Sequence, residues 1–134
     1  MVVLRSEQLP LRTDEDVVRA RQVTREWALQ QGFSLVDQTK IVTAASELAR
    51  NTVIHGGGGT LRLDALNDGP RRGLRMVFED QGAGIADVEL ALRDGYTTGT
   101  GLGLGLGGAR RLMSEFQIAS VPGAGTTITA VRWR

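Results

Sequence analysis

The sequence contains no cysteine. A chain without thiols cannot build a disulfide framework, a redox-active dithiol or a thiolate metal site, so these classes of protein are excluded. The sequence also lacks an apolar run of the roughly 18 residues that a membrane-spanning helix needs. Its first residues, MVVLRSEQLPLRTDED, include no apolar stretch of signal-peptide length. We therefore expect a cytoplasmic protein with no membrane contact.

The sequence also has no large excess of positive or negative charge. The chain has 16 Lys+Arg against 15 Asp+Glu, for a net charge of +1, and Lys40 is its only lysine. Because the sequence has no cluster of basic residues that would attract a nucleic-acid backbone, we expect no nucleic-acid partner. A length of 134 residues with 41% hydrophobic content predicts one globular domain, residues 1–134, with one core.

The spacing of apolar residues predicts a β-α-α-β-β-loop-α-β-β order. Spacings of three and four residues predict the helices, and alternation predicts the strands. Ser34, with Asp37 three residues later, resembles a capping box that opens the second helix. The expected elements are an edge strand at 1–5, helices at 17–32 and 34–55, strands at 60–66 and 74–80, short helices at 86–94 and 108–115, and strands at 116–121 and 126–133. This order predicts an α+β fold, a two-layer sandwich with helices covering one face of a mixed sheet.

The segment TTGTGLGLGLGGARR at residues 97–111 raises the question of function. Gly103, Gly105 and Gly108 match the dinucleotide fingerprint G-x-G-x-x-G, but no strand precedes them and no acidic residue follows Glu115. A P-loop needs a lysine directly after its last glycine, whereas Lys40 lies in another predicted helix. Two interpretations stay open: a flexible tether, or a loop whose backbone N–H groups meet phosphate just before a helix.

Two further motifs favour phosphate chemistry. In ELARN, Glu47 and Asn51 are four residues apart and share one helix face. A carboxylate can accept a hydroxyl proton, and an amide oxygen can ligate Mg²⁺. In EDQGAGI, Asp80 ends a predicted strand and precedes Gly82 and Gly84, so its carboxylate can accept a hydrogen bond from an exocyclic amine. Alone, each motif is also compatible with a solvated helix face or a plain turn.

Together and in this order, ELARN, DQGAG, GLGLGLGG and the Gly-Thr pair at 125–126 resemble the Bergerat ATP-binding fold of the GHKL superfamily. The resemblance implies that Asn51 holds Mg²⁺, that Asp80 recognises adenine, and that residues 101–107 close over the phosphates as a lid. It also implies that Thr126 lies near the adenine edge. The nucleotide-binding residues that it implies are Asn51, Asp80, Gly82, Gly84, Ile85, Thr100, Gly101, Leu102, Gly103, Leu104, Gly105 and Thr126, with Asn51 as the metal ligand.

The branch of the superfamily follows from what this chain lacks. A histidine kinase needs a phosphoacceptor histidine on a dimerising helix pair, but the only histidine, His55, lies on the predicted nucleotide-binding helix, where we expect a structural role. Gyrase-type and chaperone relatives carry long lids and transducer domains, for which 134 residues leave no room. The chain resembles the bacterial serine/threonine kinases that regulate sigma factors by partner switching, and most closely the switch kinases of the stressosome.

The resemblance implies a function. The kinase would transfer the γ-phosphate of ATP to Ser or Thr of STAS-domain antagonist proteins, with Glu47 as the catalytic residue, and would activate a PP2C-type phosphatase when released. The His-Gly pair at 55–56 is more typical of anti-sigma factor kinases, so direct binding of a sigma factor with phosphorylation of an anti-anti-sigma STAS protein is the alternative. An ATP-dependent binding module without phosphotransfer is a second alternative, and a scaffold that binds no nucleotide is a third.

Overall fold

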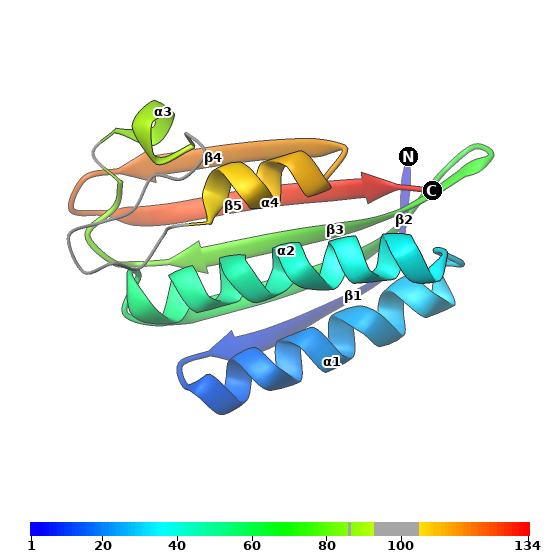
Figure 1. Cartoon of the computed structure of the whole chain (residues 1–134), viewed down its shortest axis with the longest axis horizontal. Coiled ribbons are helices and arrows are strands. Elements are labelled where there is room, and N and C mark those ends of the chain that lie inside the picture. Colours follow the sequence, from blue (N-terminus) through cyan, green and yellow to red (C-terminus); the bar gives the residue numbers. More distant parts are fainter. Residues whose placement is uncertain (86, 93–104) are drawn as a thin grey trace.

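The computed structural model describes residues 1–85, 87–92 and 105–134, which form a sheet with helices on one face (Figure 1). The sheet has five strands in the order β1-β2-β3-β5-β4. In chain order the elements are β1 (Val2–Leu11), α1 (Asp14–Gln30), α2 (Leu35–Ile54), β2 (Gly59–Asp68), β3 (Arg71–Asp80), α3 (Val88–Ala91), α4 (Leu106–Leu112), β4 (Glu115–Val121) and β5 (Gly125–Trp133). The predicted element order and the α+β class are confirmed.

The prediction of a mixed sheet was wrong, because every neighbouring pair of described strands is antiparallel. Short turns join β2 to β3 and β4 to β5, and such hairpins reverse the chain. Between β1 and β2 the chain reverses direction three times, into α1, into α2 and into β2 (Figure 1), so β2 starts beside the end of β1, with Gly59 opposite Leu11. A single crossover helix would instead have produced a parallel pair.

The helices α1, α2 and α4 lie on the same face of the sheet (Figure 1), and the core fills the space between these two layers. Alternate residues of the strands point into this space. Leu61 and Leu63 of β2, and Met76 and Phe78 of β3, are at most 1% exposed. Trp27 of α1 packs into the same cluster. Helix α2, in the middle of the layer, packs against α1, α4 and three strands, which makes it the element on which a site can be held most rigidly.

The helix starts follow local capping chemistry. Ser34 caps α2 by accepting a hydrogen bond from the backbone N–H of Asp37, as predicted, but the Asp37 carboxylate accepts from Arg132 instead of closing the box. The complete capping box lies one helix earlier, where Thr13 and Asp16 bond each other's backbone N–H groups. None of the described helices is both long and apolar enough to span a membrane.

Several element boundaries differ from the predictions, and two of these differences have a clear local cause. Strand β1 continues to Leu11 rather than ending at residue 5, and it includes Pro10. Proline is tolerated there because β1 is an edge strand and its outer side needs no N–H donor. Helix α4 begins at Leu106, two residues before the predicted start, after Gly105 with φ +68°.

Candidate functional site

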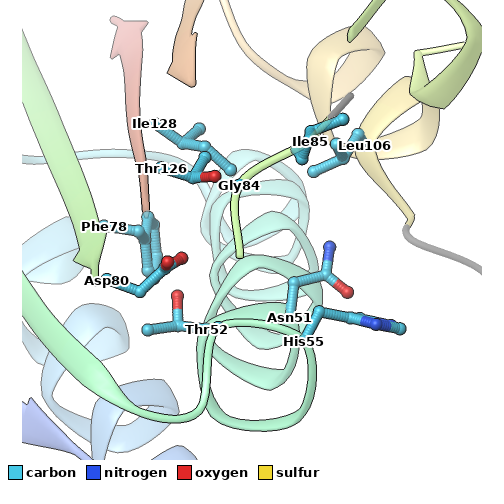
Figure 2. A pocket seen from close by; sticks show the side chains of 11 residues that line it. Asn51, Thr52, His55, Phe78, Asp80, Gly84, Ile85, Leu106, Thr126 and Ile128 are labelled. Carbon is cyan, nitrogen blue, oxygen red and sulfur yellow. The ribbon is translucent and has the colours of Figure 1, made fainter. Parts of the chain in front are cut away.

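A pocket lies at the end of the sheet where β3 stops and β5 starts (Figure 2). The antiparallel register places Asp80 between Gly59 of β2 and Thr126 of β5. Helix α2 lines another side of the pocket with its last turns. The lining residues are Asn51, Thr52, His55, Gly56, Phe78, Asp80, Gly84, Ile85, Leu106, Thr126 and Ile128. Segments distant in the sequence thus meet at one site.

The Asp80 carboxylate is the acidic group of this pocket. One of its oxygens accepts a hydrogen bond of 2.9 Å from the backbone N–H of Gly82, and among the described residues no Lys, Arg or His forms an ion pair with it. A Cβ atom on Gly56 would lie 2.5 Å from the Asp80 carboxyl carbon. A Cβ atom on Gly82 would lie 2.6 Å from the Gly56 carbonyl oxygen. Glycine at position 56 therefore leaves room for the carboxylate, and glycine at position 82 allows the loop after β3 to approach the end of α2.

The loop after β3 is held by a residue that the sequence reasoning missed. The hydroxyl of Ser120 accepts the Ile85 N–H at 2.7 Å and lies 2.8 Å from the Thr126 hydroxyl. The Gly123 N–H donates to the Ala83 carbonyl at 2.7 Å. These bonds fix the loop against the β4–β5 turn. A polar residue at an inward-facing strand position, two residues after the inward Ile118, was the signal that could have identified Ser120.

Apolar side chains form the walls around the carboxylate. Phe78 and Leu106 are each 1% exposed, Ile128 is 5% exposed, and Ile85 is partly buried. Figure 2 shows Ile85 and Leu106 together on one side of the pocket, with Asp80 on another. A hydrogen-bond acceptor among apolar walls suits a flat heteroaromatic ring that carries an exocyclic amine.

Glu47 and Asn51, which the sequence placed on one face of a helix, have different surroundings on α2. Asn51 lines the pocket, whereas Glu47, one turn earlier, lies outside the lining, against the start of α4. A Cβ atom on Gly105 would lie 2.5 Å from a Glu47 carboxylate oxygen, so glycine there leaves room for the Glu47 side chain. The positive φ of Gly105 adds a second reason for glycine. Glu47 is partly buried and borders two grooves of the helical layer.

The predicted residues thus fall into three groups. Asn51, Asp80, Gly84, Ile85 and Thr126 line one pocket, and Gly82 adjoins it through the bond to Asp80. Glu47 and Gly105 meet beside it. The predicted lid residues Thr100, Gly101, Leu102, Gly103 and Leu104 lie outside the described residues.

The structure also adds residues to the pocket. His55, predicted to be structural, is the exposed C-cap of α2 and borders the pocket. Further members that the sequence reasoning did not name as site residues are Thr52, Gly56, Phe78 and Ile128, and Leu106, predicted as part of the lid, is instead a buried residue of α4 in the pocket wall. Phe78 lies two residues before Asp80, and Leu106 directly follows Gly105. Such inward-facing neighbours of predicted site residues were the available signal.

No group of three or more His, Cys, Asp or Glu residues is close enough to form a metal site by itself in the part of the chain that the structure describes. A cation at this pocket would have water and substrate oxygens available as ligands beside those of the protein. Mg²⁺ is commonly bound in this way, through one or two protein ligands, water and substrate phosphates. The amide oxygen of Asn51 is of the chemical type that Mg²⁺ prefers.

Comparison with known proteins agrees with this architecture. The histidine kinase-like ATPase domain matches residues 10–132, and the chain belongs to this family. It is 46% identical over 121 residues to the serine/threonine-protein kinase RsbT of Bacillus subtilis (strain 168), covering 90% of this chain and 91% of that protein. It is also 29% identical to the anti-sigma F factor of Thermoanaerobacter sp. (strain X514), covering 85% of this chain and 82% of that protein. The predicted enzyme class, a protein serine/threonine kinase, and the predicted use of ATP are confirmed.

Solved structures share the fold. A crystal structure of the RsbU and RsbW domains of a Mycobacterium tuberculosis protein superposes with a TM-score of 0.63 at 25% identity. That match covers 97% of this chain, which spans only 33% of the longer one. The catalytic domain of the histidine kinase ThkA superposes with a TM-score of 0.57 at 16% identity, covering 96% of this chain and 97% of that domain. The RsbT and anti-sigma relatives together identify a kinase of the partner-switching type.

Proposed function

We propose that this chain phosphorylates Ser or Thr of a STAS-domain protein in a bacterial stress-response module of the stressosome type, using Mg²⁺ and ATP. The observation that carries the proposal is the pocket itself. It presents the Asp80 carboxylate between glycines and apolar walls, with Asn51 at its edge and Glu47 one helical turn away. The similarity to RsbT over nine-tenths of the chain supports the choice of substrate class.

The described residues fit the nucleotide. Asp80 would accept a hydrogen bond from the exocyclic amine of adenine, and the Thr126 hydroxyl, held by Ser120, would lie at the edge of the ring. Phe78 and Ile128 would pack against the ring. Asn51 would hold Mg²⁺ through its amide oxygen, and the bound cation would supply neutralising charge for the phosphates. Residues 101–104 are proposed to cover the phosphates, whereas residues 106 and 107 of the predicted lid belong to the first turn of α4 and are buried.

Glu47 is proposed as the general base. Its carboxylate would accept the proton of the substrate hydroxyl as the hydroxyl oxygen forms its bond to the γ-phosphorus. The bond from that phosphorus to the bridging oxygen breaks, and ADP leaves with the electron pair. Packing against Gly105 restricts the carboxylate, and such positioning supplies most of the catalysis in phosphoryl transfer.

The proposal extends to partners. When released from the STAS protein, the kinase would activate a PP2C-type phosphatase; the structural likeness to a protein that joins RsbU and RsbW domains is the support for this pairing. A second candidate function is an anti-sigma factor kinase that holds a sigma factor directly. The similarity to the anti-sigma F factor favours it. Capture of a sigma factor from the native extract, in place of STAS proteins or a phosphatase, would support the second candidate.

The direct test is incubation of the chain with Mg²⁺-ATP and the STAS-domain proteins encoded near its gene, followed by mass spectrometry of the phosphorylated residue. The Glu47→Gln variant should lower kcat by about 10²- to 10⁴-fold, the usual contribution of a general base. Its ATP affinity should stay close to that of the wild type. Glu79→Gln is the control, since Glu79 is exposed on β3. Transfer at the wild-type rate by Glu47→Gln would contradict the role of Glu47, whereas ATP binding without transfer by the wild type would favour the binding module.

A further inference from the structure

The carboxylate of Glu47 has no polar partner that fixes its position. In the part of the chain that the structure describes, no group forms a hydrogen bond or an ion pair with it. The side chain is partly buried and lies beside α4, the helix that packs against α2. The atoms packed around the carboxylate therefore decide where it lies.

The residue in contact with this carboxylate is Gly105, the N-cap of α4. A Cβ atom built on Gly105 would lie 2.5 Å from Oε2 of Glu47, 3.3 Å from its carboxyl carbon and 3.2 Å from its Cβ. The Glu47 side chain thus lies across the α-carbon of Gly105. Because the nearest atom is the free end of a flexible side chain, a methyl group at position 105 would displace the carboxylate and not the backbone.

The backbone at Gly105 is anchored by its own helix. Its carbonyl accepts the Ala109 N–H at 2.9 Å, and the next residue, Leu106, is 1% exposed. Leu106 lines the nucleotide pocket, whereas Gly105 does not, although the family resemblance implied that Gly105 binds the nucleotide. The first turn of α4 therefore borders the pocket on one side and the Glu47 carboxylate on the other (Figure 1).

We propose that Gly105 is a positioning residue that acts through Glu47. The absence of a side chain at position 105 gives the carboxylate room to lie where it reaches the substrate hydroxyl, and the anchored α-carbon limits how far the carboxylate turns. This inference rests on the proposed function, in which Glu47 is the base, and specifies how that base is held. Misplacement of a catalytic group by about 1 Å lowers the rate by up to roughly 10²-fold.

The test is Gly105→Ala in the whole chain, with saturating Mg²⁺-ATP and the STAS-domain protein that the wild type phosphorylates. The kcat should fall by about 10- to 100-fold, because the methyl group displaces the carboxylate. The Kd for Mg²⁺-ATP, measured by calorimetry, should stay within about twofold of the wild-type value, because Gly105 lies outside the pocket lining. An unchanged kcat would overturn the inference, whether or not the Kd rises.

Two other glycines separate the contact with Glu47 from backbone strain. Gly69, in the β2–β3 turn, also has a positive φ, +61°, but a Cβ atom there would meet nothing within 4 Å. Gly108 lies on α4 itself, and a Cβ atom there would also point into open space. Gly69→Ala should lower the urea midpoint as much as Gly105→Ala, since alanine is strained at positive φ. Both control variants should keep the wild-type kcat, and an equal loss of kcat in either would overturn the inference.

The Glu47→Gln background shows whether Gly105 acts through the base. Glutamine has nearly the shape of glutamate but cannot accept the proton, so Gly105→Ala then has no base to displace. Adding Gly105→Ala to Glu47→Gln should leave the residual kcat unchanged, because residues that act as a unit are not additive. A further tenfold loss would overturn this inference alone. Failure of the wild type to phosphorylate any STAS-domain protein would overturn the proposed function, and this inference with it.

Discussion

Two carboxylates on neighbouring strands of the sheet have opposite surroundings. Asp64 of β2 is 2% exposed and accepts hydrogen bonds from the Ser6 hydroxyl at 2.6 Å, from Arg75 at 2.8 Å and from Arg62 at 3.2 Å. Asp80 of β3 accepts a single described hydrogen bond, from the Gly82 N–H, and faces a pocket. The strands are paired in one sheet, but one carboxylate has its counter-charges within the protein and the other has none among the described residues.

The pKa of Asp64 reflects these surroundings. Burial by itself raises the pKa of this carboxyl, but the hydrogen bonds from Ser6 and Arg75 and the charge of Arg62 outweigh it, so the pKa lies below its ordinary value of 3.8. The comparison teaches how to separate structural from functional carboxylates. A carboxylate whose hydrogen bonds and counter-charges come from its own protein stabilises the fold. A carboxylate that faces a pocket without a cation is available to a ligand.

The largest expected effect is the fall in the free energy of unfolding when the Asp64 carboxylate is removed. Asp64→Ala would leave the Arg75 guanidinium, which is mostly buried, without its carboxylate partner, and should lower the free energy of unfolding by about 3 kcal/mol. Urea titration measures this change. Asp68→Ala removes a more exposed ion pair with Arg71 and should change it by no more than about 1 kcal/mol. Equal effects in the two variants would show that burial of Asp64 does not matter.

Asp80→Asn should show the opposite pattern. It should lower the affinity for ATP and leave the free energy of unfolding almost unchanged. The amide keeps an oxygen for the Gly82 N–H but replaces one acceptor by a donor, which cannot bind the adenine amine. A lost hydrogen bond to a charged group corresponds to about 1.5–3 kcal/mol, or roughly 10- to 150-fold in Kd by calorimetry. Glu79→Gln, the neighbouring exposed carboxylate, is the matched control. Normal ATP binding by Asp80→Asn would disprove the assignment of the pocket.

A smaller effect is expected at Ser120, which supports the pocket. Ser120→Ala removes the acceptor for the Ile85 N–H and the partner of the Thr126 hydroxyl. The loss of such hydrogen bonds should weaken ATP binding by about 1 kcal/mol, near fivefold in Kd. Ser114→Ala removes the acceptor for the backbone N–H of Trp133 at the other end of β5, and it should leave the Kd for ATP unchanged. If both variants bind ATP like the wild type, Ser120 has no role in positioning the loop.

The smallest expected effect is the dependence of stability on acid. Because the folded-state pKa of Asp64 lies below the ordinary value, its ionised form stabilises the fold above about pH 4, and this contribution is lost as pH falls through the lower folded-state pKa. Unfolding free energies measured from about pH 5 to pH 2 should therefore fall less steeply for Asp64→Asn than for the wild type. Parallel curves would mean that Asp64 is not preferentially ionised in the folded protein.

Local patterns predicted much of the molecule correctly. The apolar spacing of α1 and α2, the Ser34 cap and the turn before β3 depend on residues close together in the chain, so a sequence pattern records them directly. The same holds for Asp80 and its following glycines, since the Gly82 N–H bonds the carboxylate two residues earlier. These local motifs were also sufficient to indicate the ATPase family.

Contacts between distant segments could not be predicted in this way. The antiparallel pairing of β1 with β2 depends on how two helices pack as a unit, and the role of Ser120 depends on a loop 35 residues earlier in the chain. Glu47 and Asn51 share a helix face, yet the packing of α4 at Gly105 leaves only Asn51 in the pocket.

The sequence by itself therefore determined the elements, the chemical groups and the family. Only the tertiary structure decided which groups meet: Asp80 with Thr126 through strand register, and Glu47 with Gly105 through the packing of α4 on α2. The physical reason is that backbone and capping preferences act over a few residues, whereas burial of one shared core fixes the relative positions of segments that the sequence separates.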